Sequence, residues 1–241
     1  MDTAADPFLR IPAGLKAIIF DLDGTLYRQR RLQFATSLRF FRQYWYRPTS
    51  ARRTVRAIRA YLSAPDTLRN EVLEDHEQDL PALHLKRASQ LSGLPEDYVR
   101  ECARRWIMEE PLGILPRYLH DSLHEVLNEF RSAGLKLAVF SDYPAAEKLS
   151  ALGVRHFFDL ISSAHDREVG RFKPDPRGLL LSMEKLGVSA AETLYVGDRQ
   201  AIDGVAAERA GVAFAVAGDG HPRPSSSFRE LLAAVKTKNC A

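Results

Sequence analysis

Five short, mainly apolar runs are spaced along the chain, and they restrict its fold more than any other feature. They occupy residues 15–20, 135–140, 158–162, 193–196 and 212–216, and each contains at most one charged residue. A short, largely apolar run of this kind is typical of a strand buried on both faces of a parallel sheet. Helical patterns separate the later runs, at residues 119–133, 144–152, 176–187 and 200–210. This alternation predicts an α/β fold built on a doubly wound parallel sheet.

The stretch between the first two apolar runs contains no strand candidate. Residues 28–112 instead predict helices at about 31–46, 50–63, 66–79, 81–92 and 95–109. The breaks between them are expected at Pro48, Pro65, Pro81 and the turn that ends at Pro95. We therefore expect an all-helical cap at residues 28–115, inserted into a Rossmann-like core made of residues 1–27 and 116–241. The segment PLGILP at 111–116 suits a hinge between the two.

Two carboxylates follow the first apolar run, in the segment DLDGTL at residues 21–26. They stand at the carboxyl end of a predicted strand, where open α/β sheets bind ligands. Asp21 is ionised at neutral pH and can act as a nucleophile without a base. Asp23 can give a proton to a leaving oxygen and take one from water. Gly24 allows a sharp turn beneath a phosphate, and Thr25 offers a hydroxyl group to that turn.

A carboxylate that attacks a phosphate is an anion approaching an anion. Two unit charges at 4 Å repel by about 4 kcal/mol at an effective dielectric constant near 20, so the site requires a cation. Asp198 and Asp203 follow the fourth apolar run, in the segment VGDRQAID. Asp198 alone could simply cap a helix. Together with the first segment, its hard oxygen atoms favour a Mg²⁺ site.

Two further residues complete the predicted site. Ser141 closes the second run and can donate a hydrogen bond to a phosphate oxygen, while Pro144 opens a helix whose N-terminus favours anions. Lys173 precedes a helix in the segment GRFKPDP. In isolation Ser141 would be a turn residue and Lys173 a solvated surface residue. Their place among the other segments favours phosphate binding.

These segments resemble, in order and spacing, the motifs of the haloacid dehalogenase-like hydrolase superfamily. The matching segments are DLDGTL, the FSD of 140–142, Lys173 with Pro174, and GDRQAID. The resemblance implies that Asp21 is the nucleophile and Asp23 the general acid/base. It also implies that Mg²⁺ is held by Asp21, the main-chain carbonyl of Asp23 and Asp198, and that Ser141 and Lys173 bind the phosphoryl oxygens. The helical insert is similar to the type-one cap of the phosphoglycolate phosphatase subgroup.

The resemblance implies a Mg²⁺-dependent phosphatase that hydrolyses the phosphate monoester of a small anionic metabolite through an aspartyl-phosphate intermediate. A halide-releasing hydrolase would need neither Asp23 nor Asp198. A phosphomutase or phosphotransferase of the same superfamily stays open as an alternative, as does a non-catalytic binding module that uses the basic cap. The nature of the metabolite and the oligomeric state are not specified by the sequence.

Two positions depart from the family pattern. Asp142 stands where the family commonly has Asn, and Arg199 stands where it often has Ser. We place Asp142 with the substrate-binding residues, where its charge would oppose an anion. Asp203 and Thr25 are expected to support the site.

Positive charge is concentrated in residues 28–69, which hold eleven arginines and a single acidic residue, Asp66. We expect one or two of Arg52, Arg53, Arg56 and Arg59 to pair with a second anionic group on the substrate, and of these Arg52, Arg56 and Arg59 share a helix face. The whole chain has a net charge of only +3, so no nucleic-acid or membrane partner is expected. Two cysteines in unrelated contexts and an acidic N-terminus predict a cytoplasmic protein.

Overall fold

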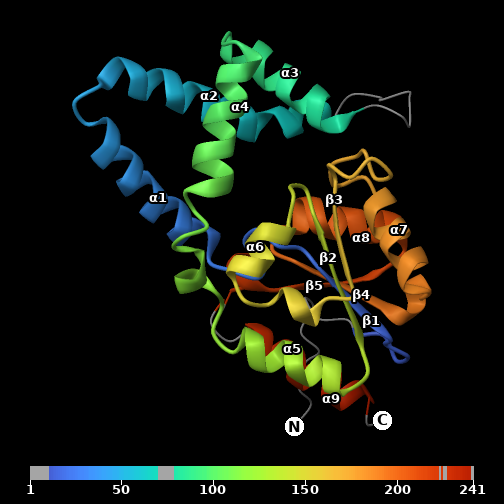
Figure 1. Ribbon diagram of the computed structural model, residues 1–241. Coiled ribbons are helices and arrows are strands. Elements are labelled where there is room, and N and C mark those ends of the chain that lie inside the picture. Colours follow the sequence, from blue (N-terminus) through green and yellow to red (C-terminus); the bar gives the residue numbers. More distant parts are fainter. Residues whose placement is uncertain (1–10, 70–78, 223, 225–226, 240–241) are drawn as a thin grey trace.

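The computed structural model describes residues 11–69, 79–222, 224 and 227–239. Its centre is a parallel sheet with the strand order β3-β2-β1-β4-β5 (Figure 1). The strands are β1 (Ala17–Phe20), β2 (Lys136–Ser141), β3 (Leu160–Ser163), β4 (Thr193–Gly197) and β5 (Ala213–Val216). Each strand coincides with one of the predicted apolar runs, because a strand covered on both faces needs apolar side chains at successive positions. The predicted fold class is confirmed.

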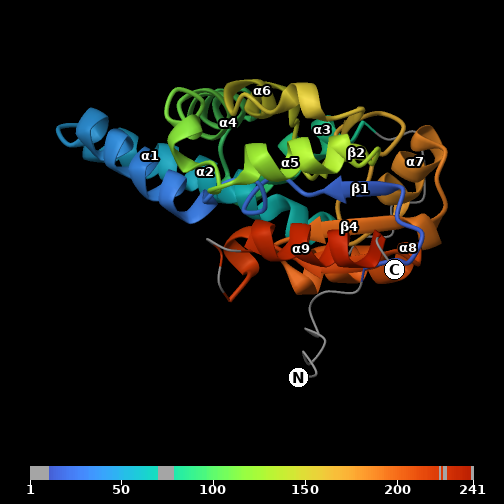
Figure 2. The same cartoon turned by 90° about the horizontal axis from the view of Figure 1, so that it is seen from below.

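Alternate residues of the central strand β1 point to opposite faces of the sheet. Ile18 and Phe20 pack in one hydrophobic cluster with α5 (Leu123–Ser132) and α9 (Ser227–Asn239). Ala17 and Ile19 pack in a second cluster with α7 (Arg177–Leu186) and α8 (Val205–Ala210). Helices α5 and α9 contact each other along the first face (Figure 2). The sheet is therefore covered on both sides, as a doubly wound fold requires.

Shorter elements connect these layers. Helix α6 (Ala146–Ala151) follows β2, and α8 is preceded by a π-helical turn. The remaining turns are 3-10 helical at Leu115–Tyr118, Arg155–Phe157, Ala190–Glu192 and Gly218–Gly220, and π-helical at Arg104–Glu109 and Gln200–Gly204. Helix α9 was not predicted from the sequence. Within the described residues, no helix is both long enough and apolar enough to span a membrane.

An all-helical insert separates β1 from β2 and lies beyond one end of the sheet (Figure 1). It contains α1 (Gln29–Tyr44), α2 (Pro48–Leu68), α3 (Leu80–Ser92) and α4 (Glu96–Ala103), which continues into the turn Arg104–Glu109. Helices α2, α3 and α4 have a hydrophobic cluster of their own, which includes Ala57, Tyr61, Leu85, Ala88, Val99 and Cys102. Helix α1 buries only Leu32, so it is the least enclosed helix of the insert.

The predicted helix break at Pro65 is wrong, because α2 runs through this residue to Leu68. A proline inside a helix leaves the carbonyl four residues earlier without its usual partner. That carbonyl belongs to Tyr61, and the Nε2 atom of His84 in α3 donates to it at 2.8 Å. A side chain from the next helix thus replaces the lost bond. The rest of the predicted helix at 66–79 lies largely outside the described residues.

The insert contacts the core at the end of α2 and the start of α3. Leu68 and Leu80 of the insert form a buried cluster with Ala164 and Phe172 of the core. Beside this cluster, the Nδ1 atom of His84 lies 3.3 Å from the Nε2 atom of His165 in the loop after β3.

Candidate active site

The carboxyl ends of β1 and β4 bring three predicted carboxylates together. Asp21 follows β1 and is 2% exposed, while Asp198 and Asp203 follow β4. One oxygen from each of the three lies within 4.8 Å of the others. Because adjacent parallel strands end at the same edge of the sheet, residues far apart in the chain converge there.

Lys173 lies among these carboxylates and is fully buried. Its Nζ atom donates to Oδ1 of Asp21, to Oδ1 of Asp203 at 2.7 Å and to the hydroxyl of Tyr195 at 3.1 Å. Burial alone would lower the pKa of Lys173, but the charges of Asp203 and Asp21 raise it well above its usual value. Lys173 is therefore a fixed cation. We call Asp21, Lys173, Asp198 and Asp203 the strand-end cluster.

Three groups from outside the strand-end cluster orient its carboxylates. The hydroxyl of Thr25 donates to Oδ2 of Asp21 at 3.0 Å. Both oxygens of Asp203 accept hydrogen bonds from the protein, Oδ1 from Lys173 and Tyr195, and Oδ2 from the main-chain N–H of Arg199 at 3.0 Å. Asp203 is thus saturated with donors and holds Lys173 in place, which fits the supporting role predicted for it.

Asp198 lacks such donors. Its Oδ1 atom is buried and accepts no hydrogen bond from any residue in the described ranges, and the Nε atom of Arg199 lies 3.8 Å away. Burial and the charge of Asp21 raise the pKa of Asp198 to about 7. Burial also raises the pKa of Asp21 to about 6, despite the opposing charge of Lys173. A buried carboxylate oxygen without a donor, next to a second carboxylate, fits a hard divalent cation such as Mg²⁺.

The loop beneath Asp198 accepts only glycine at position 24. Gly24 has a φ of +91°, and a Cβ atom there would lie 2.4 Å from the carboxylate Oδ2 of Asp198. The backbone of the DLDGTL segment can therefore approach Asp198 closely. The close approach of Gly24 to Asp198 brings the DLDGTL segment next to the VGDRQAID segment.

Asp23 has a different set of contacts, which the sequence did not reveal. Its Oδ1 atom accepts from the hydroxyl of Tyr27 and from the Nζ atom of Lys148 in α6, the latter at 2.5 Å. Burial would raise the pKa of Asp23, but the charge and hydrogen bond of Lys148 lower it overall. Both partners contact the same oxygen and so fix the orientation of the carboxylate. Tyr27 directly follows the DLDGTL segment, whereas nothing in the sequence pattern singles out Lys148.

Ser141 and Asp142 lie at the end of β2 and are both buried. The Oδ1 atom of Asp142 accepts from the main-chain N–H of Lys173 at 2.9 Å, and its Oδ2 atom accepts from Arg69 at 2.7 Å. The side chain of Arg69 comes from the insert, is 11% exposed, and also donates from Nε to the carbonyl of Lys173. Asp142 therefore ties the insert to the core. Contact between Ser141 or Asp142 and a phosphate stays a prediction.

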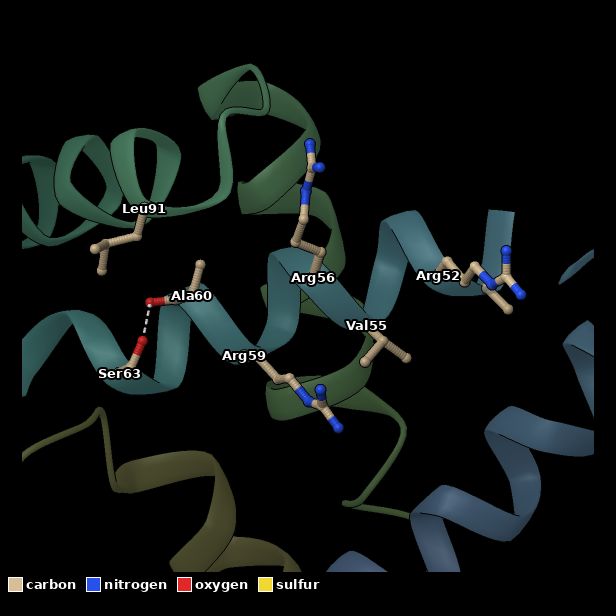
Figure 3. Close-up of a pocket in the computed structure, with 8 residues that line it drawn as sticks. Arg52, Val55, Arg56, Arg59, Ala60, Ser63 and Leu91 are labelled. Carbon is tan, nitrogen blue, oxygen red and sulfur yellow. Dashed lines mark hydrogen bonds between the residues drawn. The ribbon is translucent and has the colours of Figure 1, made fainter. Parts of the chain in front are cut away.

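The side chains of the α2 arginines that could pair with a substrate anion point in different directions. Arg52, Arg56 and Arg59 are exposed on α2 and border an open groove of about 660 Å³ (Figure 3). Their guanidinium groups diverge from the helix in that view. Only Arg59 also lines the cavity that reaches Asp23. Of the arginines expected to pair with a substrate anion, Arg59 is therefore the one that lines this cavity, and its pairing with a substrate stays a prediction.

Comparison with known proteins gives matches over most of the chain. The sequence profile of the haloacid dehalogenase-like hydrolase family matches residues 15–211. Glyceraldehyde 3-phosphate phosphatase from Methanopyrus kandleri is 28% identical over 204 residues, which cover 82% of each chain. Phosphoglycolate phosphatase from Aquifex aeolicus is 28% identical over 224 residues, or 90% of this chain and 91% of the relative. A crystal structure of a HAD-superfamily hydrolase, subfamily IA, from Geobacter sulfurreducens has a TM-score of 0.58 at 21% identity and covers 93% and 97% of the two chains.

Proposed function

Because the chain belongs to the haloacid dehalogenase-like hydrolases, as its motifs predicted, we propose that it is a Mg²⁺-dependent phosphatase. The reaction is hydrolysis of the phosphate monoester of a small metabolite through an aspartyl phosphate on Asp21. Relatives named for glyceraldehyde 3-phosphate and for phosphoglycolate support a phosphatase of this kind. The observation that carries the proposal is the strand-end cluster, in which three carboxylates and the buried Lys173 meet at one edge of the sheet.

Asp21 is the nucleophile of the proposed reaction. Lys173 and Thr25 hold its two oxygens, so the carboxylate is oriented before the substrate arrives. A carboxylate oxygen of Asp21 forms a bond to phosphorus while the bond from phosphorus to the leaving oxygen breaks. In the second step water attacks the same phosphorus, which releases inorganic phosphate and restores Asp21. The fixed charge of Lys173 offsets negative charge on the phosphoryl oxygens throughout.

Asp23 moves the proton in both steps. Because the pKa of Asp23 is lowered, it takes a proton from the bound phosphate monoester and passes it to the departing alkoxide oxygen, and in the second step it takes one from the attacking water. Tyr27 and Lys148 bind its Oδ1 atom, which keeps the carboxyl group from rotating. Because both groups donate to Oδ1, proton transfer is favoured at Oδ2 of Asp23.

The cation would be held by Asp21, the main-chain carbonyl of Asp23 and Asp198. When bound, Mg²⁺ supplies the positive charge that lets a carboxylate approach a phosphate. The donor-free Oδ1 of Asp198 supports this assignment. Asp203 is better suited to holding Lys173, since protein donors occupy both of its oxygens. We also propose that residues 28–115 act as the cap over a core of residues 1–27 and 116–241.

A panel of phosphate monoesters tests the proposal through release of inorganic phosphate with Mg²⁺ and with a chelator. We expect turnover only with the metal. Asp21→Asn should lower kcat by about four orders of magnitude or more, because it removes the nucleophile while keeping its shape. Asp97→Asn is the matched control, since Asp97 is an exposed carboxylate in a surface ion pair. Full activity of Asp21→Asn, or in chelator, would contradict the mechanism.

The phosphomutase alternative predicts a different fate for the phosphoryl group. Incubation with labelled substrate and an unlabelled sugar phosphate would move the label to the second sugar in a mutase. In a phosphatase the label appears as inorganic phosphate, which is the result that we expect.

A further inference from the structure

A cavity of about 490 Å³ begins beside Asp23 and extends between the insert and the core. Asp23, Tyr27, Tyr143 and Lys148 line it from the core. Its walls come from α1, from α2, from the turn Arg104–Glu109 and from the residues that lead back to the core. We call it the cap cavity. Asp23, which protonates the leaving oxygen in the proposed reaction, therefore lies in the wall of the cap cavity.

The walls of the cap cavity are largely apolar. Aliphatic and aromatic side chains from four segments of the chain face it, among them Leu32, Phe40, Ile58, Leu62, Trp106 and Leu115. Two of these, Leu32 and Trp106, are only 5% exposed. Such a lining binds ligands by removing apolar surface from water, with polar groups at one end to fix the orientation.

Cations are scarce in the cap cavity. Among the described residues that line it, only Arg59 and Lys148 are cationic. Lys148 is already paired with Asp23, and Arg59 is an exposed residue. The cavity therefore does not resemble a site for a leaving group that carries several charges, for which paired or bidentate cations would be expected.

The position of Asp23 decides which part of the substrate enters the cap cavity. The group that protonates the leaving oxygen must lie on the leaving-group side of the phosphorus. The alcohol that departs therefore occupies the space that begins at Asp23, while the phosphoryl group stays with the strand-end cluster. At about 490 Å³ the cap cavity lies within the range of about 300 to 1,000 Å³ that is typical of ligand pockets. A two-carbon acid would leave most of this wall uncovered.

We propose that the preferred substrates are phosphate monoesters of alcohols with an extended apolar body, such as an alkyl, prenyl or aryl group. This inference rests on the proposed phosphatase activity and assigns a substrate class to it. The apolar body lies along α1 and α2, and the ester oxygen lies against Asp23. The phosphate reaches Asp21 and Lys173 at the edge of the sheet.

A series of n-alkyl phosphates from ethyl to octyl tests the inference, with phosphoglycolate as the charged comparison. We expect kcat/KM to rise about two- to fourfold with each added methylene until the cavity is filled, mainly through a lower KM. Octyl phosphate should then be a better substrate than phosphoglycolate. A flat or falling series, or a clear preference for phosphoglycolate, would overturn the inference.

Variants locate the effect in the cap cavity. Leu62 lines the cavity and is 45% exposed, and Leu180 on the core helix α7 is 47% exposed and does not line it. Leu62→Asn should lower kcat/KM for octyl phosphate by about 3- to 10-fold and leave ethyl phosphate unchanged. Leu180→Asn should change neither. Equal effects of the two variants would contradict the inference.

A second variant fills the space instead of changing its polarity. Ser37 is an exposed residue of α1 that lines the cavity, so a larger side chain there is compatible with folding. Ser37→Trp should raise KM for octyl phosphate and spare ethyl phosphate, because only the longer chain needs the occupied volume. If it impairs both esters equally, the cavity does not hold the alkyl chain.

Binding of alkylphosphonates separates this inference from the proposed function. Their bond from carbon to phosphorus is not hydrolysed, so calorimetry with Mg²⁺ measures affinity alone. We expect octylphosphonate to bind at least about tenfold more tightly than ethylphosphonate. If this preference holds and no ester is cleaved, the proposed function is wrong and the cavity assignment stands. If all esters are cleaved equally and the two phosphonates bind alike, the phosphatase stands and the inference is wrong.

Discussion

The strand-end cluster and the cap cavity differ in almost every physical respect. The cluster consists of buried ion pairs on strand ends and their loops, and its residues lie in recognisable motifs. The cavity consists of apolar side chains on inserted helices, and no motif marks them. The difference suggests a division of labour in which the sheet fixes the chemistry and the insert selects the leaving group. Each of the following experiments tests one side of that division.

Of the variants that follow, Asp23→Asn should have the largest effect, because Asp23 lines the cap cavity and transfers the proton in the proposed reaction. We expect kcat for alkyl phosphates to fall by about 10²- to 10⁴-fold, the range of general acid catalysis. The loss should be much smaller with p-nitrophenyl phosphate, whose leaving group departs without a proton. Steady-state kinetics with both substrates measure the difference. An equal loss on both would mean that Asp23 does not protonate the leaving oxygen.

Lys173→Met should have the next largest effect and should lower both the activity and the stability of the protein. The substitution leaves Asp21 and Asp203 buried without their shared cation, which costs about 3 to 5 kcal/mol in the free energy of unfolding. We expect kcat to fall by about 10²- to 10³-fold, because phosphoryl charge is no longer offset. Urea unfolding and phosphate release measure the two effects. Lys185→Met is the control, since Lys185 forms an exposed ion pair on α7 and should change neither quantity much.

Asp142→Asn probes the link between the two regions. Asp142 accepts from Arg69 of the insert and from the main chain of Lys173, so the loss of its charge should lower the free energy of unfolding by about 1 to 3 kcal/mol. Because both oxygens are engaged, we expect the inhibition constant of inorganic phosphate to change by less than about threefold. A marked gain in phosphate affinity would show instead that the charge faces the substrate, as the sequence alone suggested. Asp97→Asn again serves as the surface control.

The histidine pair at the same boundary predicts a pH dependence of stability. Burial, followed by the neighbouring His84, lowers the pKa of His165 to about 4, and the charges of Asp142 and Asp79 only partly oppose this. Burial also lowers the pKa of His84. At these two histidines the unfolded chain therefore binds more protons than the folded one between about pH 4 and 6.5, so the contribution of the pair to stability rises with pH in this window and levels off above it. The raised pKa values of Asp21 and Asp198 act in the opposite sense, so a histidine variant is needed to isolate the contribution of the pair.

His165→Gln should reduce the difference in the free energy of unfolding between pH 7 and pH 5 by about 1 to 2 kcal/mol, and so reduce the slope of stability against pH. The measurement is the urea midpoint as a function of pH for the variant and the parent protein. His156→Gln removes an exposed histidine and should leave the slope unchanged. If His165→Gln retains the full slope, the pair does not contribute to it.

The smallest effects should come from the arginines on the outer side of α2. Arg52 and Arg56 border the open groove and do not line the cap cavity. Replacing either with Gln should change KM for any substrate by less than about twofold, since exposed charges contribute little. A tenfold rise in KM would show instead that Arg52 or Arg56 binds an anionic group of the substrate.

The strand-end cluster could be predicted because sequence order and strand ends were enough to place it. Asp21, Asp198 and Asp203 were assigned to strand ends, and parallel strands end at the same edge of a sheet. Lys173 was assigned from its place among the family's motifs, and the structure brings all four residues together. That the two strands are direct neighbours became clear only from the sheet order. An apolar run predicts a strand buried on both faces even when the neighbouring strands are unknown.

The cap contacts could not be predicted, because they depend on how helices pack. The continuation of α2 through Pro65 requires His84, a residue from a different helix, to bind the free carbonyl of Tyr61. Arg69 is one of eleven arginines in its segment, and only the folded chain shows that it is the one that reaches Asp142. The contact of Lys148 with Asp23 joins a motif residue to a helix residue outside all the motifs, and no local sequence pattern predicts it.

The position of the insert also bears on how the chain folds. Strands β1 and β2 pair side by side, yet the whole insert lies between them in the sequence. Closing a flexible loop of roughly a hundred residues costs about 4 kcal/mol in chain entropy before any strand contact forms. Helices α2, α3 and α4 make contacts that are close in sequence and share their own cluster, so they can collapse first and shorten the effective loop. We therefore expect pulse-labelling hydrogen exchange to show protected amides in these helices before those of β1, with the central pairing of the sheet as the slow step.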